Sequence, residues 1–151
     1  MNIERIFIGP PSGGALEERE RVTVVAGKGI VGDRYFDRHE EPGQNITLIE
    51  AEEIEAFFAE QGRPCDLSST RRNLVTRGVR VSELIGREFT IGGVRLRGVA
   101  LCEPCMGLGR ILEGPGITPA GVVKRFLHRA GIRADVLTDG VIERGAPLRE
   151  L

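Results

Sequence analysis

The apolar periodicity of this sequence changes about every ten to fifteen residues, and 21 glycines and 8 prolines are spread along its 151 residues. Glycine adopts backbone conformations that are closed to other residues, and proline interrupts helices and central strands. The pattern therefore favours many short strands joined by tight turns over long helices. A chain of this length can bury a sufficient core without a metal or disulfides, which predicts a single domain over residues 1–151.

Short apolar runs that are rich in β-branched residues or that alternate with polar residues predict strands. We expect strands at residues 3–8, 22–26, 46–49, 71–76, 87–91, 94–101, 132–136 and 141–144. The Gly92-Gly93 pair predicts a hairpin, because glycines tolerate the positive φ angles of a two-residue turn, and Asp139-Gly140 predicts another. The alternation of the run 94–101 slips by one residue at Gly98, which predicts a β-bulge there.

Two helices are expected between the strands. Apolar residues spaced three and four apart predict a helix over residues 50–61, with Gly62 as its C-terminal stop. Thr118 and Pro119 predict the start of a second helix, which Gly131 ends, and residues 82–84 form at most one helical turn. About seven or eight short strands with two flanking helices predict a mainly β, α+β fold, a closed or partly closed mixed β-barrel.

The charge balance excludes one class of partner. The sequence has 21 lysines and arginines against 22 acidic residues, a net charge of −1, and no Trp. Proteins that coat nucleic acids need a basic surface and aromatic platforms, so we expect no nucleic-acid partner. Only Lys28 and Lys124 are lysines. A set of cations dominated by arginine suits forked recognition of phosphate or carboxylate, although genome composition explains the same bias.

The sequence also predicts where the protein is found. No run approaches the roughly 20 apolar residues of a membrane span, and the N-terminal apolar run is too short for a secretory signal. We therefore expect no membrane association and a cytoplasmic location. Three cysteines, Cys65, Cys102 and Cys105, cannot all pair within one chain, which agrees with a reducing compartment.

The sharpest local signal is the motif Cys102-Glu103-Pro104-Cys105. Two thiols at this spacing can form a disulfide, share a metal, or supply a nucleophile and its resolving partner, and both can also be inert core residues. A thioredoxin-like role needs a helix directly after the motif, and residues 106–109 are a poor helix start. A zinc site needs a second pair of ligands, and only Cys65, His39 and His128 remain.

Within the motif, Cys105 is the residue with the clearest chemistry. Pro104 stiffens the backbone, so Cys105 is expected at the mouth of the barrel as a thiolate ligand for a soft metal such as molybdenum, or as a carrier of persulfide sulfur. The other candidates have ordinary interpretations. His39 lies among charged residues typical of an exposed loop, His128 falls on the polar face of its helix, and Cys65 is expected to be a buried small hydrophobic residue.

Polar residues elsewhere are candidates for binding an anionic ligand. Arg71 and Asn73 lie two residues apart on an expected strand, so they project to one side and together suit a phosphate. A solvated arginine beside a turn-capping asparagine explains the same pattern. Asp33 after Gly32 places a carboxylate where it can accept hydrogen bonds from a heterocycle, although Gly-Asp is also ordinary turn chemistry. The same two interpretations apply to two further polar residues near an apolar strand, Gln44 and Thr47.

Taken in order, these pieces resemble the molybdenum-cofactor sulfurase C-terminal domain family, called MOSC. Each motif is weak alone, but this order and spacing are hard to reach by chance, and the resemblance covers nearly the whole chain. It runs through residues 29–34 (GIVGDR), 44–50 (QNITLIE), 71–79 (RRNLVTRGV), 84–86 (LIG), 91–93 (IGG), Pro104-Cys105 and the tail 131–145.

The resemblance implies a β-barrel domain that binds a molybdenum-pterin cofactor, the molybdopterin form of the molybdenum cofactor, or that handles sulfur for it. It implies that Cys105 is the defining residue of the site. It also implies that Arg71 and Asn73 hold the pterin phosphate, and it places the family's Gly-Asp pair on Gly32 and Asp33.

Cys102 lies outside the family's core pattern and is a candidate resolving thiol, since a disulfide to Cys105 would block a metal-ligand role. Larger proteins with this domain carry a pyridoxal-phosphate desulfurase domain or a barrel-like domain before it, and these 151 residues contain neither. Only two lysines are present, in contexts unlike a Schiff-base site, so we expect no pyridoxal phosphate and a stand-alone bacterial-type protein.

Three functions follow from these residues, and the first two favour an enzyme. The first is binding of the molybdenum cofactor, with Cys105 as the metal's thiolate ligand, and reduction of N-hydroxylated compounds with electrons from a separate donor protein. The second is a sulfur carrier, in which Cys105 accepts persulfide sulfur from a separate cysteine desulfurase and passes it to a cofactor or a metal-sulfur cluster. The third is a non-catalytic module that binds an anionic small molecule.

Overall fold

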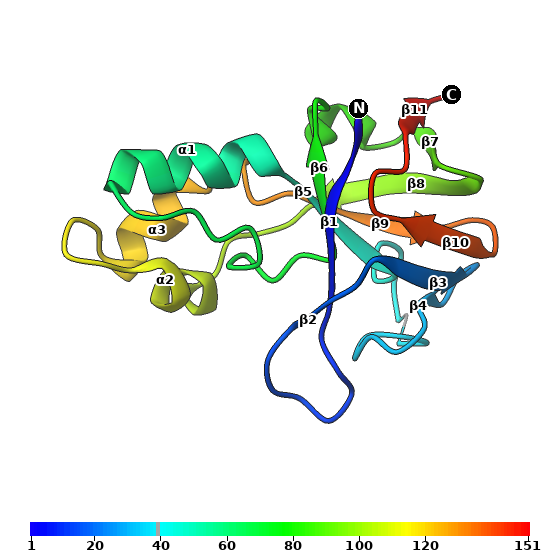
Figure 1. Cartoon of the computed structure of the whole chain (residues 1–151), viewed down its shortest axis with the longest axis horizontal. Coiled ribbons are helices and arrows are strands. Elements are labelled where there is room, and N and C mark those ends of the chain that lie inside the picture. Colours follow the sequence, from blue (N-terminus) through cyan, green and yellow to red (C-terminus); the bar gives the residue numbers. More distant parts are fainter. Residues whose placement is uncertain (39) are drawn as a thin grey trace.

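The computed structural model describes residues 1–38 and 40–151, so the prediction for His39 lies outside the described residues. Within these ranges the fold is mainly β with three helices (Figure 1). The strands are β1 (Asn2–Ile8), β2 (Glu17–Glu18), β3 (Arg21–Val25), β4 (Gly29–Ile30), β5 (Ile46–Glu50), β6 (Leu74–Arg77), β7 (Glu88–Ile91), β8 (Val94–Leu101), β9 (Ile132–Val136), β10 (Gly140–Glu143) and β11 (Leu148–Glu150). The helices are α1 (Ala51–Gln61), α2 (Met106–Leu112) and α3 (Pro119–Arg125), with a 3-10 turn, η1, at Val81–Leu84.

Eight strands form one curled, mixed sheet in the order β11-β7-β8-β9-β5-β6-β1-β2. β5 and β6 run parallel and are connected through α1, while the other neighbours in this sheet are antiparallel. A second sheet, in the order β10-β3-β4, packs against the inside of this half-barrel. The prediction of a mainly β, partly closed mixed barrel is therefore confirmed.

Two apolar clusters hold these layers together. The larger one lies between the two sheets, where Leu96 of the curled sheet is buried together with Val24 of the small sheet. The second lies among the helices, where the ring centroids of Phe57 on α1 and Phe126 after α3 are 5.2 Å apart. The three helices gather at one end of the molecule (Figure 1), so the segments that link sheet to helices cross between the two clusters.

The predicted hairpin and bulge are both confirmed. β7 and β8 pair across Gly92 and Gly93, and Gly92 has the expected positive φ of 58°. The register of β8 against β9 shifts between Gly98 and Ala100. Gly98 is packed so closely that a Cβ at this position would overlap the carbonyl of Leu84. The bulge therefore requires glycine at position 98, because there is no space for a side chain.

Helix α2 begins at Met106, where the sequence predicts no helix. Leu108 and Leu112 are buried in the helical cluster, and this packing outweighs the low helix propensity of the two glycines in the segment.

Among the described residues no helix has both the length and the apolar content needed to cross a bilayer.

Helix α3 starts as predicted and ends early. The Thr118 hydroxyl accepts the N–H of Gly121 at 3.1 Å and caps the helix, which ends at Arg125. Residues 126–130 continue in turns, where Phe126 and Ala130 are buried without a regular helix and Leu127 is exposed. His128 has a left-handed φ of 65° in this segment, so the prediction that it lies on the polar face of a helix is wrong.

The predicted hairpin turn at Asp139-Gly140 is also wrong. β9 already has β8 and β5 as neighbours, so β10 pairs with β3 in the small sheet instead. The Asp139 carboxylate accepts the N–H of Ala26 at 2.8 Å and fixes this crossing. A further strand, β11, pairs with β7, where the sequence predicts no strand.

Gly98→Ala should lower the free energy of unfolding by about 1–3 kcal/mol, because the added methyl group forces β8 away from the Leu84 carbonyl. The matched control is Gly93→Ala in the same hairpin, since nothing lies within 4 Å of a Cβ at that position. Urea unfolding followed by circular dichroism measures both variants. Equal stabilities would contradict the close packing at the bulge.

Candidate functional site

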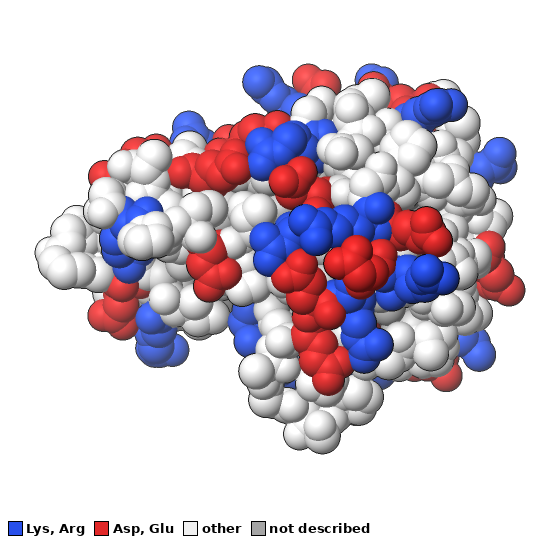
Figure 2. Space-filling view, in the orientation of Figure 1, with Lys and Arg blue, Asp and Glu red and all other residues white. Residues whose placement is uncertain are grey.

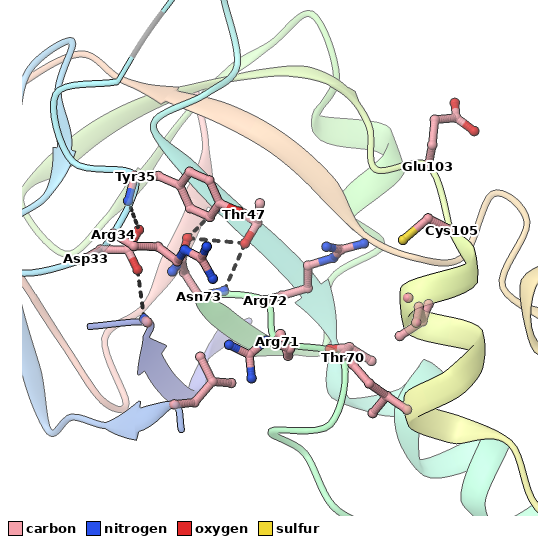
Figure 3. A pocket seen from close by; sticks show the side chains of 15 residues that line it. Asp33, Arg34, Tyr35, Thr47, Thr70, Arg71, Arg72, Asn73, Glu103 and Cys105 are labelled. Atoms are coloured by element: carbon pink, nitrogen blue, oxygen red, sulfur yellow. Dashed lines mark hydrogen bonds between the residues drawn. The ribbon is translucent and has the colours of Figure 1, made fainter. Parts of the chain in front are cut away.

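Five segments meet around a cavity of about 300 Å³ at the junction of the curled sheet and the helices (Figure 3). They are the β1–β2 loop from Gly9, residues 33–35 after β4, β5 at Thr47, residues 70–73 before β6, and the start of α2 at Cys105. The fold thus brings together most of the site residues predicted from separate parts of the sequence. Those that line the cavity are Asp33, Thr47, Arg71, Asn73 and Cys105.

A second cavity of about 460 Å³ adjoins the first. The two have five lining residues in common, which are Tyr35, Thr47, Arg72, Asn73 and Glu103. Gln44 and Cys102 line only the second cavity. The side-chain oxygen of Gln44 accepts the N–H of Glu40 at 2.7 Å, so this residue also holds its own loop. Together the two cavities form one continuous hollow in the surface.

Cys105 is exposed and occupies the position just before the first residue of α2. Its sulfur lies beside the first turn of the helix, since a Cβ at Gly107 would be 3.4 Å from it. The nearby backbone N–H groups of Leu108 and then Gly107 lower the pKa of the Cys105 thiol, and the charges of Arg72 and Arg110 add to the effect. The helix that the sequence did not predict is therefore what favours the thiolate.

Three arginines, Arg34, Arg71 and Arg72, line the cavity with Cys105 (Figure 3). No carboxylate among the described residues lies within 4.0 Å of their guanidinium nitrogens. Elsewhere basic and acidic side chains are interspersed, as on the face in Figure 2. The unpaired guanidinium groups give the cavity a positive field that favours an anionic ligand.

The loop that carries Arg71 differs from the prediction. β6 begins at Leu74, and Arg71 has a left-handed φ of 61° with its N–H donating to the carbonyl of Ser68 at 3.0 Å. The argument that Arg71 and Asn73 project from one face of a strand is therefore wrong. Both side chains still reach the cavity, because the loop turns Arg71 toward it.

Two further contacts hold the other arginines. Nε of Arg72 donates to the carbonyl of Ala130 at 3.0 Å, which anchors this side chain between the helical cluster and the cavity. The guanidinium carbon of Arg34 lies 5.2 Å from the centroid of the Tyr35 ring. Such a contact is attractive because the ring face is electron-rich. Both arginines therefore have supports that leave guanidinium nitrogens available to a ligand.

Asn73 is buried and ties three strands together. Its side-chain N–H donates to the carbonyl of Phe7 at 3.1 Å, and its side-chain oxygen accepts the backbone N–H of Thr47 at 3.1 Å and the Thr47 hydroxyl at 3.2 Å. The Thr47 hydroxyl in turn accepts the Asn73 backbone N–H at 2.9 Å. Because these bonds engage both ends of the amide, Asn73 and Thr47 position the cavity wall.

Asp33 is buried where the β1–β2 and β4–β5 loops cross. Its two carboxylate oxygens accept the N–H groups of Gly9 at 2.9 Å and Tyr35 at 3.3 Å, and the Arg34 N–H donates back to the Gly9 carbonyl at 2.7 Å. Gly32 lines neither cavity, but its φ of 89° makes the turn that presents Asp33. The Gly-Asp pair thus fixes the two loops that carry one wall.

Thr70 is a candidate site residue that the sequence analysis missed. Only 3% of it is exposed, it lines the first cavity, and its hydroxyl has no hydrogen-bond partner in the part of the chain that the structure describes. Buried hydroxyls without a partner are rare, so this one is available to a ligand. Arg34, Arg72 and Tyr35 were missed as well. The only signal for the arginines is the arginine-rich composition, which does not say which of them converge.

The other two cysteines lie in contrasting environments. Cys102 is buried, and burial raises the pKa of its thiol. Cys65 is exposed, contrary to the prediction, and the pKa of its thiol is raised, first by partial desolvation. None of the three cysteines is in a disulfide. Across residues 1–38 and 40–151 there is no group of three or more His, Cys, Asp and Glu side chains that could hold a metal ion.

The family model of the MOSC domain matches residues 36–149. The match covers most of the chain, so the chain belongs to the MOSC domain family, and the resemblance seen in the sequence is confirmed. No protein with a curated description matches the sequence.

Solved structures share this fold at low sequence identity. The YuaD protein from Bacillus subtilis has a TM-score of 0.81 and 18% identity, over 97% of this chain and 92% of that chain. YiiM from Geobacillus stearothermophilus has a TM-score of 0.71 and 20% identity, over 99% of this chain and 74% of that chain. YiiM from Escherichia coli has a TM-score of 0.70 and 17% identity, over 100% of this chain and 70% of that chain.

In metal-free protein, iodoacetamide should alkylate Cys105 before Cys65 near neutral pH. The reason is that the pKa of the Cys105 thiol is lowered and that of the Cys65 thiol is raised. Both residues are exposed, so access does not account for the difference. Peptide mass spectrometry over a series of pH values gives each rate. A Cys65 rate equal to or above that of Cys105 would be inconsistent with the helix N–H groups acting on the sulfur.

Asn73→Ala should lower the free energy of unfolding by about 1–3 kcal/mol, because it leaves the Phe7 carbonyl and the Thr47 N–H without their partner in a buried site. Arg71→Ala is the control from the same loop. Its exposed side chain has no ion pair among the described residues, so its removal should change stability by less than about 0.5 kcal/mol. Thermal and urea unfolding measure both. Similar values for the two variants would show that the amide does not hold the strands.

Proposed function

We propose that this protein binds the molybdenum cofactor in the hollow at Cys105, with the Cys105 thiolate as a ligand to the metal. One observation carries the proposal: an exposed thiol of lowered pKa shares a cavity with three arginines that lack a carboxylate partner among the described residues. Membership of the MOSC family favours the same cofactor.

The donor set of the cavity fits this cofactor. Molybdenum is a metal that thiolate sulfur suits. The pterin part carries a phosphate, and arginine binds phosphate through two parallel N–H···O bonds. Arg71 and Arg72 offer such groups, and the unpartnered hydroxyl of Thr70 offers a further bond to an oxyanion. The adjoining cavity gives room for parts of the ligand that the first does not hold.

The bound cofactor would supply a redox-active metal centre. The chain's own residues prepare the place for it. The first turn of α2 favours the thiolate of Cys105, and the arginines balance the negative charge of the phosphate. Leu108 and Ile111 form an apolar part of the wall. The buried side chains of Asn73 and Asp33 fix the loops of the cavity wall through hydrogen bonds to the Phe7 carbonyl and the Gly9 N–H.

The proposed reaction is the reduction of N-hydroxylated compounds, the activity that the family resemblance implies. A hydroxylamine, R–NHOH, takes up two electrons and two protons and yields R–NH₂ and water. The electrons come from a separate donor protein. Three cysteines without a disulfide fit a reducing compartment, and we place the protein in the cytoplasm.

The exposure of the Cys105 sulfur favours a second candidate, a sulfur carrier. The Cys105 thiolate would attack the outer sulfur of a donor persulfide, R–S–SH. A new S–S bond forms on Cys105, which becomes the persulfide, and the bond within the donor breaks to release R–S⁻. No net electrons are exchanged, so this function needs a cysteine desulfurase as partner and no metal.

Protein purified from cells that make the cofactor should contain molybdenum and a pterin that fluoresces after oxidation. Cys105→Ser removes the metal ligand and should lower the molybdenum content by roughly tenfold or more. The double variant Arg71→Ala/Arg72→Ala should lower the pterin content as well, because the phosphate loses its partners. Cys65→Ser, an exposed thiol outside both cavities, is the matched control and should retain both.

Wild-type protein with neither molybdenum nor pterin would overturn the cofactor proposal. A persulfide on Cys105, detected by mass spectrometry after incubation with a desulfurase and cysteine, would then favour the sulfur carrier. Full retention of the pterin and unchanged affinity in Cys105→Ser would instead indicate a module that binds an anionic ligand without using its thiol.

A further inference from the structure

We propose that a third cavity, beside the cavity that contains Cys105 (the Cys105 cavity), binds an apolar group of the substrate, and that Leu16 and Ile111 select substrates with such a group. The third cavity has a volume of about 460 Å³ and is lined by β1, the β1–β2 loop, β2, the loop before β6, and α2. The inference rests on the proposed function, which places the N–OH group of the substrate beside Cys105, and it extends that function to the choice of substrate.

The third cavity adjoins the Cys105 cavity. Leu16, Arg71 and Ile111 line both of them. Among the described residues, none lines both the third cavity and the second, which is the one that contains Cys102. The second and third cavities therefore adjoin the Cys105 cavity through different parts of its wall. A molecule bound beside Cys105 thus has two directions in which it can extend.

An ion pair forms one side of the third cavity. Nε and Nη2 of Arg5 donate to the two carboxylate oxygens of Glu18, both at 2.6 Å. The guanidinium carbon of Arg5 also lies 5.4 Å from the ring centroid of Phe7, so the pair lies against this ring. Because the two charges balance each other through paired hydrogen bonds, this side of the cavity does not attract a charged ligand.

The hydroxyl groups of the third cavity are engaged within their own loop. The Ser68 hydroxyl donates to the Asp66 carboxylate at 2.6 Å, and the Ser69 hydroxyl donates to the Asp66 carbonyl at 2.7 Å. Arg71 is the one charged side chain of this wall without a carboxylate partner among the described residues. It lies at the edge shared with the Cys105 cavity, so the charge that attracts an anion is confined to the entrance.

The rest of the lining is aliphatic. Leu16 is partly buried, Ala15 is exposed, and Ile111 is 50% exposed although it is a large apolar residue. Covering apolar surface is favourable by roughly 25 cal/mol for each Å² removed from water. An apolar ligand group that covers these side chains gains this free energy, whereas a charged group would lose its hydration without finding a partner there.

The second cavity has a different chemistry. The part of its lining that it does not share with the Cys105 cavity includes Arg38, Glu40, Gln44 and Arg133. Such side chains donate and accept hydrogen bonds, so they suit the ring nitrogens and oxygens of a pterin. Of the two directions open to a bound molecule, the polar one therefore suits the cofactor and the apolar one suits the substrate.

The position of Ile111 determines the size of the group. Ile111 follows Cys105 by six residues along α2, and at about 1.5 Å per helical residue this corresponds to roughly 9 Å. A methyl group on the reacting nitrogen is too short to reach Ile111, whereas a 4-butylphenyl group is long enough. We therefore expect the protein to favour arylhydroxylamines with an extended apolar substituent over small hydroxylamines.

The first test measures binding of 4-butylaniline, the amine product of such a substrate, to the 151-residue chain purified without the cofactor. NMR of the isoleucine and leucine methyl groups should show shifts of the Ile111 and Leu16 resonances during the titration. Ile111→Ala and Leu16→Ala should each weaken binding by roughly three- to tenfold, because each removes apolar contact area. Ile111→Leu should retain the affinity. Leu127→Ala is the matched control, since Leu127 is 49% exposed and lines none of the three cavities.

The second test measures substrate choice in protein loaded with the cofactor. 4-Butylphenylhydroxylamine and N-methylhydroxylamine each take up two protons and two electrons, one from each of two molecules of reduced methyl viologen, and yield the amine and water. The ratio of kcat/KM for the first substrate to that for the second should fall roughly three- to tenfold in Ile111→Ala and in Leu16→Ala. The ratio does not depend on the amount of cofactor bound, because both substrates react at the same centre. Leu127→Ala should leave the ratio unchanged.

Three results would overturn the inference. One is a titration with 4-butylaniline that does not shift the Ile111 and Leu16 resonances. Another is a shift of these resonances by adenosine monophosphate at lower concentration than by 4-butylaniline, which would assign the cavity to a polar, phosphate-linked group. The third is an unchanged kcat/KM ratio in Ile111→Ala that is folded by circular dichroism, or in Leu16→Ala if that variant alone folds.

Failure of the proposed function looks different. Wild-type protein that contains neither molybdenum nor pterin would have no reduction to measure, yet the titration with 4-butylaniline would still show whether the third cavity binds an apolar group. Conversely, protein that carries the cofactor and reduces both substrates, with the same ratio in every variant, would support the proposed function and contradict the inference.

Discussion

The cavity depends on one buried amide. Asn73 joins β1, β5 and the start of β6 through Phe7 and Thr47, at the point where the chain leaves the loop that carries Thr70 and Arg71. The loop has no regular structure of its own, so the strands on either side determine where its side chains lie. A group that bridges these strands therefore helps to fix the position of the arginines. This explains why a polar side chain is kept in a buried place, where its hydrogen bonds must all be made.

The chemistry of the site depends on cavity arginines whose positive charges have no carboxylate partner among the described residues. On the outer face of β1, β2 and β6, cations lie beside anions, as Arg5 lies 2.6 Å from Glu18. The arginines of the cavity have no such partner among the described residues, while the neighbouring thiol is shifted toward its anionic form. Both features support the proposed ligand, which carries a negative charge and a soft metal, and neither improves the stability of the chain alone.

Features of the fold that depend on neighbouring residues could be predicted from the sequence. The hairpin at Gly92-Gly93, the bulge at Gly98 and the cap at Thr118 each follow from the conformations that a few residues allow. The partner of β10 could not be predicted, because it depends on β9 already having two neighbours. Helix α2 could not be predicted either, since burial of Leu108 and Leu112 outweighs the glycines in its sequence.

The same distinction holds for the site. The sequence singles out Cys105 as a candidate because its motif is unusual. Arg71 is a candidate because of an expected strand that is not present at this residue, yet its side chain lines the cavity. Thr70 and Arg34 have no local signature, because their importance comes only from convergence with residues far away in the sequence. Asn73 is expected to contact a ligand, and its hydrogen bonds give it a further role in the wall of the cavity.

The two thiols of the motif differ in exposure and in pKa, and this difference determines which of them is oxidised first. Peroxide oxidises thiolates that solvent can reach, and beyond the sulfenic acid the damage is not reversed by ordinary reductants. Cys105 meets both conditions, whereas Cys102 is buried and its pKa is raised. Stored without a reductant, the protein would lose the Cys105 thiolate to oxidation while its core stays intact, so a correctly folded sample can still be inactive.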